Sequence, residues 1–280
     1  MLQLLIILMT FGSFEGAADI DYDIQGNIYV VDRDGRMLIK LSPLGDSLRA
    51  VSGFGRERLQ FDEPVAVCAR RGNDIYVADY NNHRIQRFNR TLDLVAIIHT
   101  RDDANPISRF GYPRDVAVTR QGELLVVDSE NRRIVRINTA GQGVDAFGDI
   151  SAGAGRLFDP SKIEVDESDN AYVLDGGRII QFDPFGSYVR TIPSRIDTIV
   201  SISVDRDTLL ITGRTEVTLY DLATLSHVGT YELGIPVVAM RYSNRRFIGL
   251  ERMQGVVYGA EGDESIRNYR KEKGIHPEEP

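Results

Sequence analysis

The stretch of sequence that decides the fold is DIYVADYNNHRIQRF, residues 74–88. Its first six residues, a short run of β-branched and aromatic side chains ending in aspartate, recur along the chain. The four copies occupy residues 27–32, 74–79, 123–128 and 170–175. Their closing aspartates are 47, 49 and 47 residues apart. A fixed period of this length is typical of proteins in which each repeat forms one supersecondary unit.

Two weaker copies follow, at residues 209–213 and 247–251, where the aspartate is lost and the spacing shortens to 38 residues. Other residues recur at a fixed distance from the aspartate in the stronger copies. Pro64, Pro113 and Pro160 each stand fifteen residues before the aspartate of their repeat. The six copies together predict six similar units in one domain.

Each unit is predicted to contain four short strands. In the second copy these strands are residues 65–69, 75–78, 84–88 and 94–99, separated by turns rich in Gly, Asn and Asp. A single four-stranded sheet cannot bury both of its faces, whereas six sheets arranged radially pack each face on a neighbour. The sequence therefore predicts an all-β fold: a six-bladed β-propeller of four-stranded antiparallel blades.

Residues 79–88 of the second copy and 128–137 of the third resemble the NHL repeat, and looser copies extend the resemblance over about residues 14–258. The resemblance implies a six-bladed propeller of the NHL type. It is specific for fold rather than for chemistry.

The residues of this motif have a structural interpretation. An aspartate at the end of a strand can accept backbone N–H bonds from a loop. Asn82 is expected to tolerate left-handed backbone geometry in the loop that follows, and Arg84 to reach an acid or a carbonyl oxygen. The repeated aspartates are therefore predicted to be structural turn residues rather than catalytic ones. They are Asp32, Asp79, Asp128 and Asp175.

Residues 1–13 have two alternative interpretations. Residues 1–9 are nearly all apolar and small residues follow at 16–18, as in a signal peptide, although the usual positive charges are missing. The register of the repeats instead makes residues 4–10 an outer strand that completes the last blade and closes the ring. Residues 265–269 compete for that place. The propeller is expected to span 14–262, followed by a polar tail at 263–280.

Composition excludes several classes of protein. The 280 residues include one cysteine, which excludes an internal disulfide framework, and no apolar run long enough for a membrane-spanning helix. Acidic residues outnumber basic ones by 41 to 33, which argues against a nucleic-acid partner. We expect a monomer that is secreted or periplasmic, with a cytoplasmic location as the alternative.

Ligands of propellers usually bind at the central channel or the loops around its mouth. The strand that follows each proline is expected to be innermost, and its alternation turns one set of side chains toward the channel. The charged members of this set are Asp19, Asp21, Asp115, Lys162, Glu164 and Arg241. This mixed ring suits a hydrated cation or a polar ligand such as a sugar. The alternative is that these charges pair with one another and with the backbone between blades.

No catalytic arrangement stands out in the sequence. The four histidines, His83, His99, His227 and His276, occupy no common position in the repeat, which argues against a three-histidine zinc site. Cys68 is expected to be a buried strand residue.

We therefore favour a non-catalytic propeller that binds a protein, peptide or glycan, with no cofactor predicted. The first alternative is a hydrolase, lactonase or lyase that uses a divalent cation (Ca²⁺, Mg²⁺ or Zn²⁺) at the channel. The second is binding of single-stranded RNA through an arginine stripe. The stripe comprises Arg84, Arg87, Arg132, Arg133 and Arg136.

Overall fold

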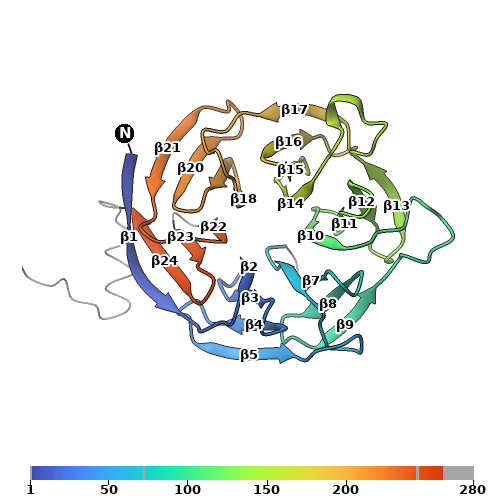
Figure 1. The fold of residues 1–280 in the computed structure, drawn as a ribbon, viewed down its shortest axis with the longest axis horizontal. Helices are drawn as coiled ribbons and strands as arrows, with labels where there is room; N and C mark the ends of the chain where they lie inside the picture. Colours follow the sequence, from blue (N-terminus) through green and yellow to red (C-terminus); the bar gives the residue numbers. More distant parts are fainter. Residues whose placement is uncertain (1, 72, 244–245, 261–280) are drawn as a thin grey trace, which may run out of the picture.

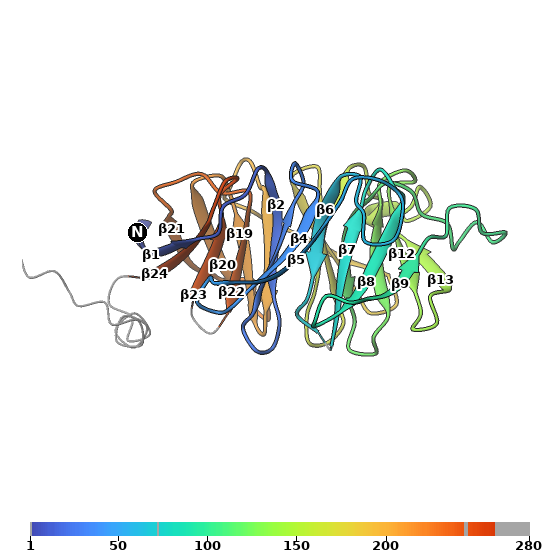
Figure 2. The ribbon, with the colours of Figure 1, turned by 90° about the horizontal axis from the view of Figure 1, so that it is seen from below.

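The computed structural model describes residues 2–71, 73–243 and 246–260. This part of the chain forms 24 β-strands and one short 3-10 turn, η1 (Gly153–Gly155). The sheets are arranged radially around a central axis (Figure 1), and seen from the side the ring has the shape of a flat disc (Figure 2). Within the described residues no helix has the length and apolar character needed to span a membrane. The prediction of an all-β propeller is confirmed.

Four of the sheets contain four antiparallel strands, ordered from the axis outward as they occur in the chain. The first two sheets are β2 (Ala17–Tyr22), β3 (Ile28–Asp32), β4 (Met37–Leu41) and β5 (Ser47–Ser52), then β6 (Pro64–Cys68), β7 (Asp74–Asp79), β8 (Arg84–Asn89) and β9 (Leu94–Ile98). The next two are β10 (Pro113–Val118), β11 (Leu124–Asp128), β12 (Arg133–Ile137) and β13 (Gly143–Phe147), then β14 (Pro160–Val165), β15 (Ala171–Asp175), β16 (Arg178–Phe182) and β17 (Tyr188–Ile192).

The fifth sheet has eight strands in the order β18-β19-β20-β21-β1-β24-β23-β22. These strands are β18 (Ser201–Asp205), β19 (Thr208–Thr212), β20 (Glu216–Asp221), β21 (His227–Glu232), β1 (Leu2–Phe11), β24 (Gly255–Ala260), β23 (Arg246–Leu250) and β22 (Ala239–Ser243). The prediction of six separate four-stranded blades is therefore wrong. Counted as hydrogen-bonded sheets, the propeller has five blades, one of them of double width.

The merger results from the length and register of β1. From Leu5 to Phe11 this strand runs antiparallel to β24, from Ala260 to Gly255. Its first three paired residues, from Leu2 to Leu4, continue past the end of β24 and run parallel to β21. One ten-residue strand thus belongs to both halves of the sheet, and the antiparallel pattern is broken where they join. The competing segment, residues 265–269, lies outside the described residues.

Six strands of the described residues surround the axis, each packed against the next: β2, β6, β10, β14, β18 and β22. The apolar core lies between neighbouring sheets rather than at the axis. Val77 and Phe88 of one sheet, for example, pack with Tyr29 and Leu38 of the sheet before it. Strand β3 is buried along its whole length, whereas the outer strand β5 is largely exposed. The axis is therefore left to the polar side chains of the inner strands.

The antiparallel strands place their connections on two faces of the disc. The turns that follow inner strands, such as residues 23–27 after β2, lie on one face, which we call the channel-mouth face. The loops that follow the repeated aspartates, such as residues 80–83 after β7, lie on the opposite face, which we call the repeat-loop face. Gly26 and Gly122 occupy equivalent turns on the first face, both with φ of +82°, a left-handed conformation that favours glycine.

Candidate functional site at the central channel

The inner strands bring the predicted channel residues together. Asp19 and Asp21 lie two positions apart on β2, as Lys162 and Glu164 do on β14, so each pair shares one side of its strand. Asp115 comes from β10 and Arg241 from β22. The alternation along each strand therefore places charges from four inner strands around one axis.

Arg241 joins the first inner strand to the last. Its Nη2 atom is 3.3 Å from Oδ1 of Asp19, and its Nε atom is 3.5 Å from Oδ1 of Asp21. The same Nη2 atom lies 3.7 Å from Oε1 of Glu164. Lys162 approaches Asp19 from the other side, at 3.2 Å. Because Arg241 is only 3% exposed, this group of charges is shielded from solvent.

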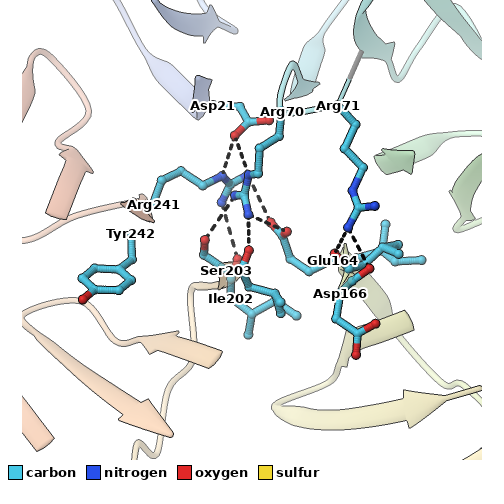
Figure 3. Close-up of polar contacts among 12 residues, drawn as sticks. Asp21, Arg70, Arg71, Glu164, Asp166, Ile202, Ser203, Arg241 and Tyr242 are labelled. Carbon is cyan, nitrogen blue, oxygen red and sulfur yellow. Dashed lines mark hydrogen bonds and ion pairs between the residues drawn. The ribbon is translucent and has the colours of Figure 1, made fainter. Parts of the chain in front are cut away.

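Arg70 completes the network, although it is not among the channel residues that strand alternation predicts. Its Nε atom lies 3.2 Å from Oδ1 of Asp21, and its Nη1 atom lies 3.4 Å from Oε2 of Glu164. It also donates to Ser203 Oγ on β18 (Figure 3) and to the carbonyl of Val204 on the same strand. Arg70 stands just beyond the end of β6. Extending the alternation of Ala66 and Cys68 by two residues would have found it.

The channel carboxylates also bind backbone of the adjacent sheet. Asp19 accepts the N–H of Val67 at 3.1 Å, and Asp21 accepts the N–H of Ala69 at 2.8 Å. Asp115 repeats this arrangement two interfaces further on, between β10 and β14, where it accepts the N–H of Ile163 at 2.9 Å. Each bond spans two neighbouring sheets. These acids therefore connect the sheets to one another while they line the channel.

Burial shifts the titration of this network. Desolvation raises the pKa of Asp115 from 3.8 to about 7, although the charge of Lys162 opposes the shift. Desolvation also raises the pKa of Glu164, against the attraction of Arg70 and Arg241. The pKa of the Cys68 thiol is raised by burial too, which disfavours the nucleophilic thiolate. The chemistry of the channel is thus that of paired and shielded charges.

A cavity of about 740 Å³ opens from this network toward the channel-mouth face. Asp21, Asp115, Glu164 and Arg241 line it, together with the missed residue Arg70. Asp19 and Lys162 are absent from its wall. The last residue of β18, Asp205, and turn residues after β14 and β18 complete the rim; the turn residues include Asp166, Glu167 and Arg206.

The described residues contain no group of three or more His, Cys, Asp or Glu side chains arranged to hold a metal ion. His83 and His99, which the repeat pattern separates, do line one cavity of about 480 Å³ on the repeat-loop face. The Nδ1 atom of His83 accepts the backbone N–H of Tyr112 at 3.0 Å. His276 lies outside the described residues.

The repeated aspartates hold the repeat-loop face together. Asp79 accepts the backbone N–H of Asp62, in the connection that precedes β6, and the side chains of Asn82 and Arg84. The prediction that Arg84 reaches an acid or a carbonyl oxygen is confirmed, since it bonds to Asp79 and also donates to the carbonyls of the 56–60 loop. The left-handed residue of the next loop is His83, with φ of +50°, so that assignment to Asn82 is wrong.

Three further carboxylates lie at the equivalent place. Asp32 accepts the N–H groups of Glu15 and Gly16, and Asp128 accepts that of Gly111. Asp175 accepts the N–H of Phe158 and that of the next residue, at 2.8 and 2.6 Å. All four are 2% exposed or less. Each joins the connection before an inner strand to the end of the adjacent strand.

Most arginines of the stripe considered for RNA binding form ion pairs within the protein. Arg84 pairs with Asp79 at 2.9 Å and Arg133 with Asp128 at 3.1 Å. The other two pairs, again one in each repeat, are Arg87 with Asp74 at 2.6 Å and Arg136 with Glu123 at 2.9 Å.

Comparison with known proteins agrees with this architecture. A family model of the NHL repeat matches residues 61–88 and 110–137. The protein brain tumor of Drosophila melanogaster is 35% identical over 138 residues, 48% of this chain but only 13% of that protein. This chain therefore spans a small part of its relative's length.

Two solved structures share the fold. The virginiamycin B lyase of Staphylococcus aureus superposes with a TM-score of 0.62 at 14% identity, over 90% of this chain and 98% of that one. A streptogramin B lyase gives 0.61 at 14% identity, over 86% and 78%. At this identity the likeness concerns the fold.

The ring of sheets and its charged channel define a β-propeller of the binding type. The two repeats matched by the family model are the two that carry the fullest Asp-Asn-Arg motif, in β7–β8 and β11–β12. The chain thus contains two segments that match the NHL repeat.

Proposed function

We propose that this chain is a non-catalytic binding module that recognises a protein, peptide or glycan on a face of the propeller. The observation that carries the proposal is that all four channel carboxylates are already bound by other groups of the protein. Asp19, Asp21 and Glu164 pair with Arg or Lys side chains, and Asp115 accepts a backbone N–H of the next sheet. Carboxylates that are already paired or hydrogen-bonded in this way stabilise the contacts between sheets and are not free to bind a metal ion or a substrate.

The likeness to other proteins supports a binding role. NHL repeats are typically modules of protein interaction, and two are present here. The fold also resembles two lyases, which keeps a channel-centred lyase or hydrolase as the second candidate. That candidate needs a general base or a metal-bound water with free access to substrate. The ion pairs of Glu164 and the backbone bond of Asp115 work against both requirements.

A photo-crosslinking experiment tests the proposal. The crosslinking amino acid p-benzoylphenylalanine replaces Ile24 on the channel-mouth face or Phe54 on the repeat-loop face, where both side chains are exposed. We expect one of these positions to give a saturable, stoichiometric adduct that excess unlabelled partner displaces, and virginiamycin B and simple lactones to remain unchanged by the protein. Turnover of either substrate that chelator and Asp115→Ala abolish would establish the enzyme instead.

A location outside the cytoplasm and a monomeric state remain proposals, based on the apolar run at residues 1–9 and on the closed ring. Cleavage near residue 17 would remove β1, which pairs with both β21 and β24. The mass of the mature N-terminus tests the location, and sedimentation equilibrium tests the monomer.

A further inference from the structure

We propose that the cavity at the channel mouth binds a peptide segment through a lysine or arginine side chain, with Asp205 and Glu167 as the main acceptors. This inference rests on the proposed binding function and adds a site and a ligand class to it. The site is the 740 Å³ recess on the channel-mouth face, at the ends of the inner strands.

The wall of this cavity has more acidic than basic groups. Seven carboxylates face four arginines, a formal excess of three negative charges. The carboxylates are Asp21, Asp23, Asp115, Glu164, Asp166, Glu167 and Asp205, and the arginines are Arg70, Arg71, Arg206 and Arg241. A concave site with this imbalance attracts positive charge.

Three of the four arginines are already used by other partners. Arg70 and Arg241 bind Asp21 and Glu164 deep in the channel. Arg71 donates to the backbone carbonyl of Asp166 at 2.7 Å (Figure 3). Its Nη2 atom is 3.7 Å from Glu167, beyond hydrogen-bond distance. The outer carboxylates therefore keep unused acceptor capacity.

Asp205 is the clearest example. It ends β18 at the cavity wall and is half-buried, yet its carboxylate accepts no hydrogen bond from the described residues. Desolvation raises its pKa although the charges of Arg70 and Arg206 oppose the shift, so a hydrogen-bond donor at this carboxylate would favour its charged form. Glu167 stands on the same rim with 68% of its side chain exposed. An ammonium or guanidinium group placed between them would supply the missing donors.

An exposed aliphatic side chain lines the same cavity as these acids. Ile24 is 72% exposed, although its turn is fixed by Asp23, which accepts the N–H groups of Gln25 and Asn27 at 2.9 and 3.0 Å. The methylene stem of a lysine or arginine covers such a surface while its charged end reaches an acid. Ile24 thus favours a side chain with a long aliphatic stem over a bare inorganic cation.

The recess continues beyond a single side chain. A second cavity of about 680 Å³ shares Ile24, Arg70, Arg71 and Glu167 with the first and extends outward past residues 96–99 of the β9 region. The two cavities together provide room for flanking residues of an extended chain. This length is the reason for proposing a peptide segment rather than a small free amine.

The test uses the peptide acetyl-Leu-Arg-Leu-amide as the probe, titrated calorimetrically into the full chain. We expect saturable binding that weakens with added salt, and no binding of the same peptide with citrulline or glutamate at its centre. The double variant Asp205→Asn/Glu167→Gln should weaken binding at least about tenfold. The control variant Glu57→Gln removes an exposed carboxylate on the opposite face and should change nothing.

A second variant, Ile24→Ser, removes apolar surface without changing charge and should weaken binding by about threefold. The proposal is overturned if the citrulline peptide binds equally well, or if the double variant, folded by its unfolding midpoint, binds like the wild type. Equal binding of putrescine would overturn the choice of a peptide. Absence of peptide binding together with a crosslinked partner at Phe54 would reject this site and leave the binding function intact.

Discussion

Arg241 and Asp19 stand 222 positions apart in the sequence, and the Nη2 atom of the arginine lies 3.3 Å from Oδ1 of the aspartate. The contact joins the last inner strand, β22, to the first, β2. Both side chains are buried, at 3% and 0% exposure. The channel thus closes the ring by charge at the axis, while β1 closes it by backbone hydrogen bonds at the rim.

Replacing Arg241 should therefore be costly. Arg241→Met removes the buried guanidinium that Asp19 and Asp21 share and leaves them with Lys162 and Arg70, and we expect a loss of about 3–5 kcal/mol in the free energy of unfolding. Urea denaturation measures it. The control is Arg252→Met, which breaks an exposed pair with Asp34 at 2.7 Å and should cost at most about 1 kcal/mol. Equal losses in the two variants would show that the channel network stabilises the fold no more than an exposed ion pair does.

The repeated aspartates should behave as structural residues. Asp79→Ala removes the acceptor for three donors and leaves the buried guanidinium of Arg84 without its acid, so we expect a loss of about 3–5 kcal/mol. Asp79→Asn keeps an acceptor oxygen and should cost less. The unfolding midpoint of each variant in urea measures the effect. A fully stable Asp79→Ala variant would contradict the structural role of the motif.

Stability should depend on pH through Asp115. Its pKa is about 7 in the folded chain against an ordinary value of 3.8, so between those values the folded state holds a proton that the unfolded chain releases. This residue's contribution to stability therefore falls as pH rises through that window, by up to about 1.4 kcal/mol per pH unit. Asp115→Asn should gain stability relative to wild type from pH 4 to pH 7, as urea midpoints would show.

An exposed acid supplies the control for that experiment. The hydrogen bond from Arg252 lowers the pKa of Asp34, so its contribution is present above its ordinary pKa and is lost as pH falls. Asp34→Asn should therefore lose stability relative to wild type as pH rises. If both variants changed in the same direction, burial of Asp115 would not be the cause of its effect.

The N-terminal strand should contribute in two separable parts. Deleting residues 2–4 removes the parallel pairing with β21 but keeps the pairing with β24, whereas deleting residues 2–10 removes both. We expect faster amide exchange at residues 227–232 in the first variant, and at both 227–232 and 255–260 in the second, with self-association through the freed edges. Unchanged exchange in the larger deletion would show that β1 does not close the ring.

The sequence predicts the repeat architecture well because each unit carries its own local signals. The aliphatic run that ends in Asp79 is β7, and the prolines at 64, 113 and 160 open inner strands. The number of sheets could not be predicted in this way. It depends on the pairing of Leu2 with Thr230, a long-range register that no local pattern encodes.

The channel shows the same limit. Strand alternation predicts that Asp19, Asp21, Asp115, Lys162, Glu164 and Arg241 turn toward the axis, where the structure places them near one another. Arg70 is the next position of the same alternation after Cys68, but it lies beyond the end of β6, so a search confined to the strands does not include it. The cavity lined by both His83 and His99 could not be predicted from the sequence either. His83 lies in a loop and His99 directly follows the outer strand β9, so only the folded structure brings them together.

We propose that the channel charges neutralise one another and do not form a metal-activated catalytic centre. Titration calorimetry of the purified chain with Ca²⁺, Mg²⁺ and Zn²⁺ is the decisive measurement, with Glu164→Gln and Asp21→Asn measured in parallel. We expect no saturable binding that depends on these two carboxylates. Binding of one divalent ion per chain that is lost in either variant would show that the channel holds a metal ion.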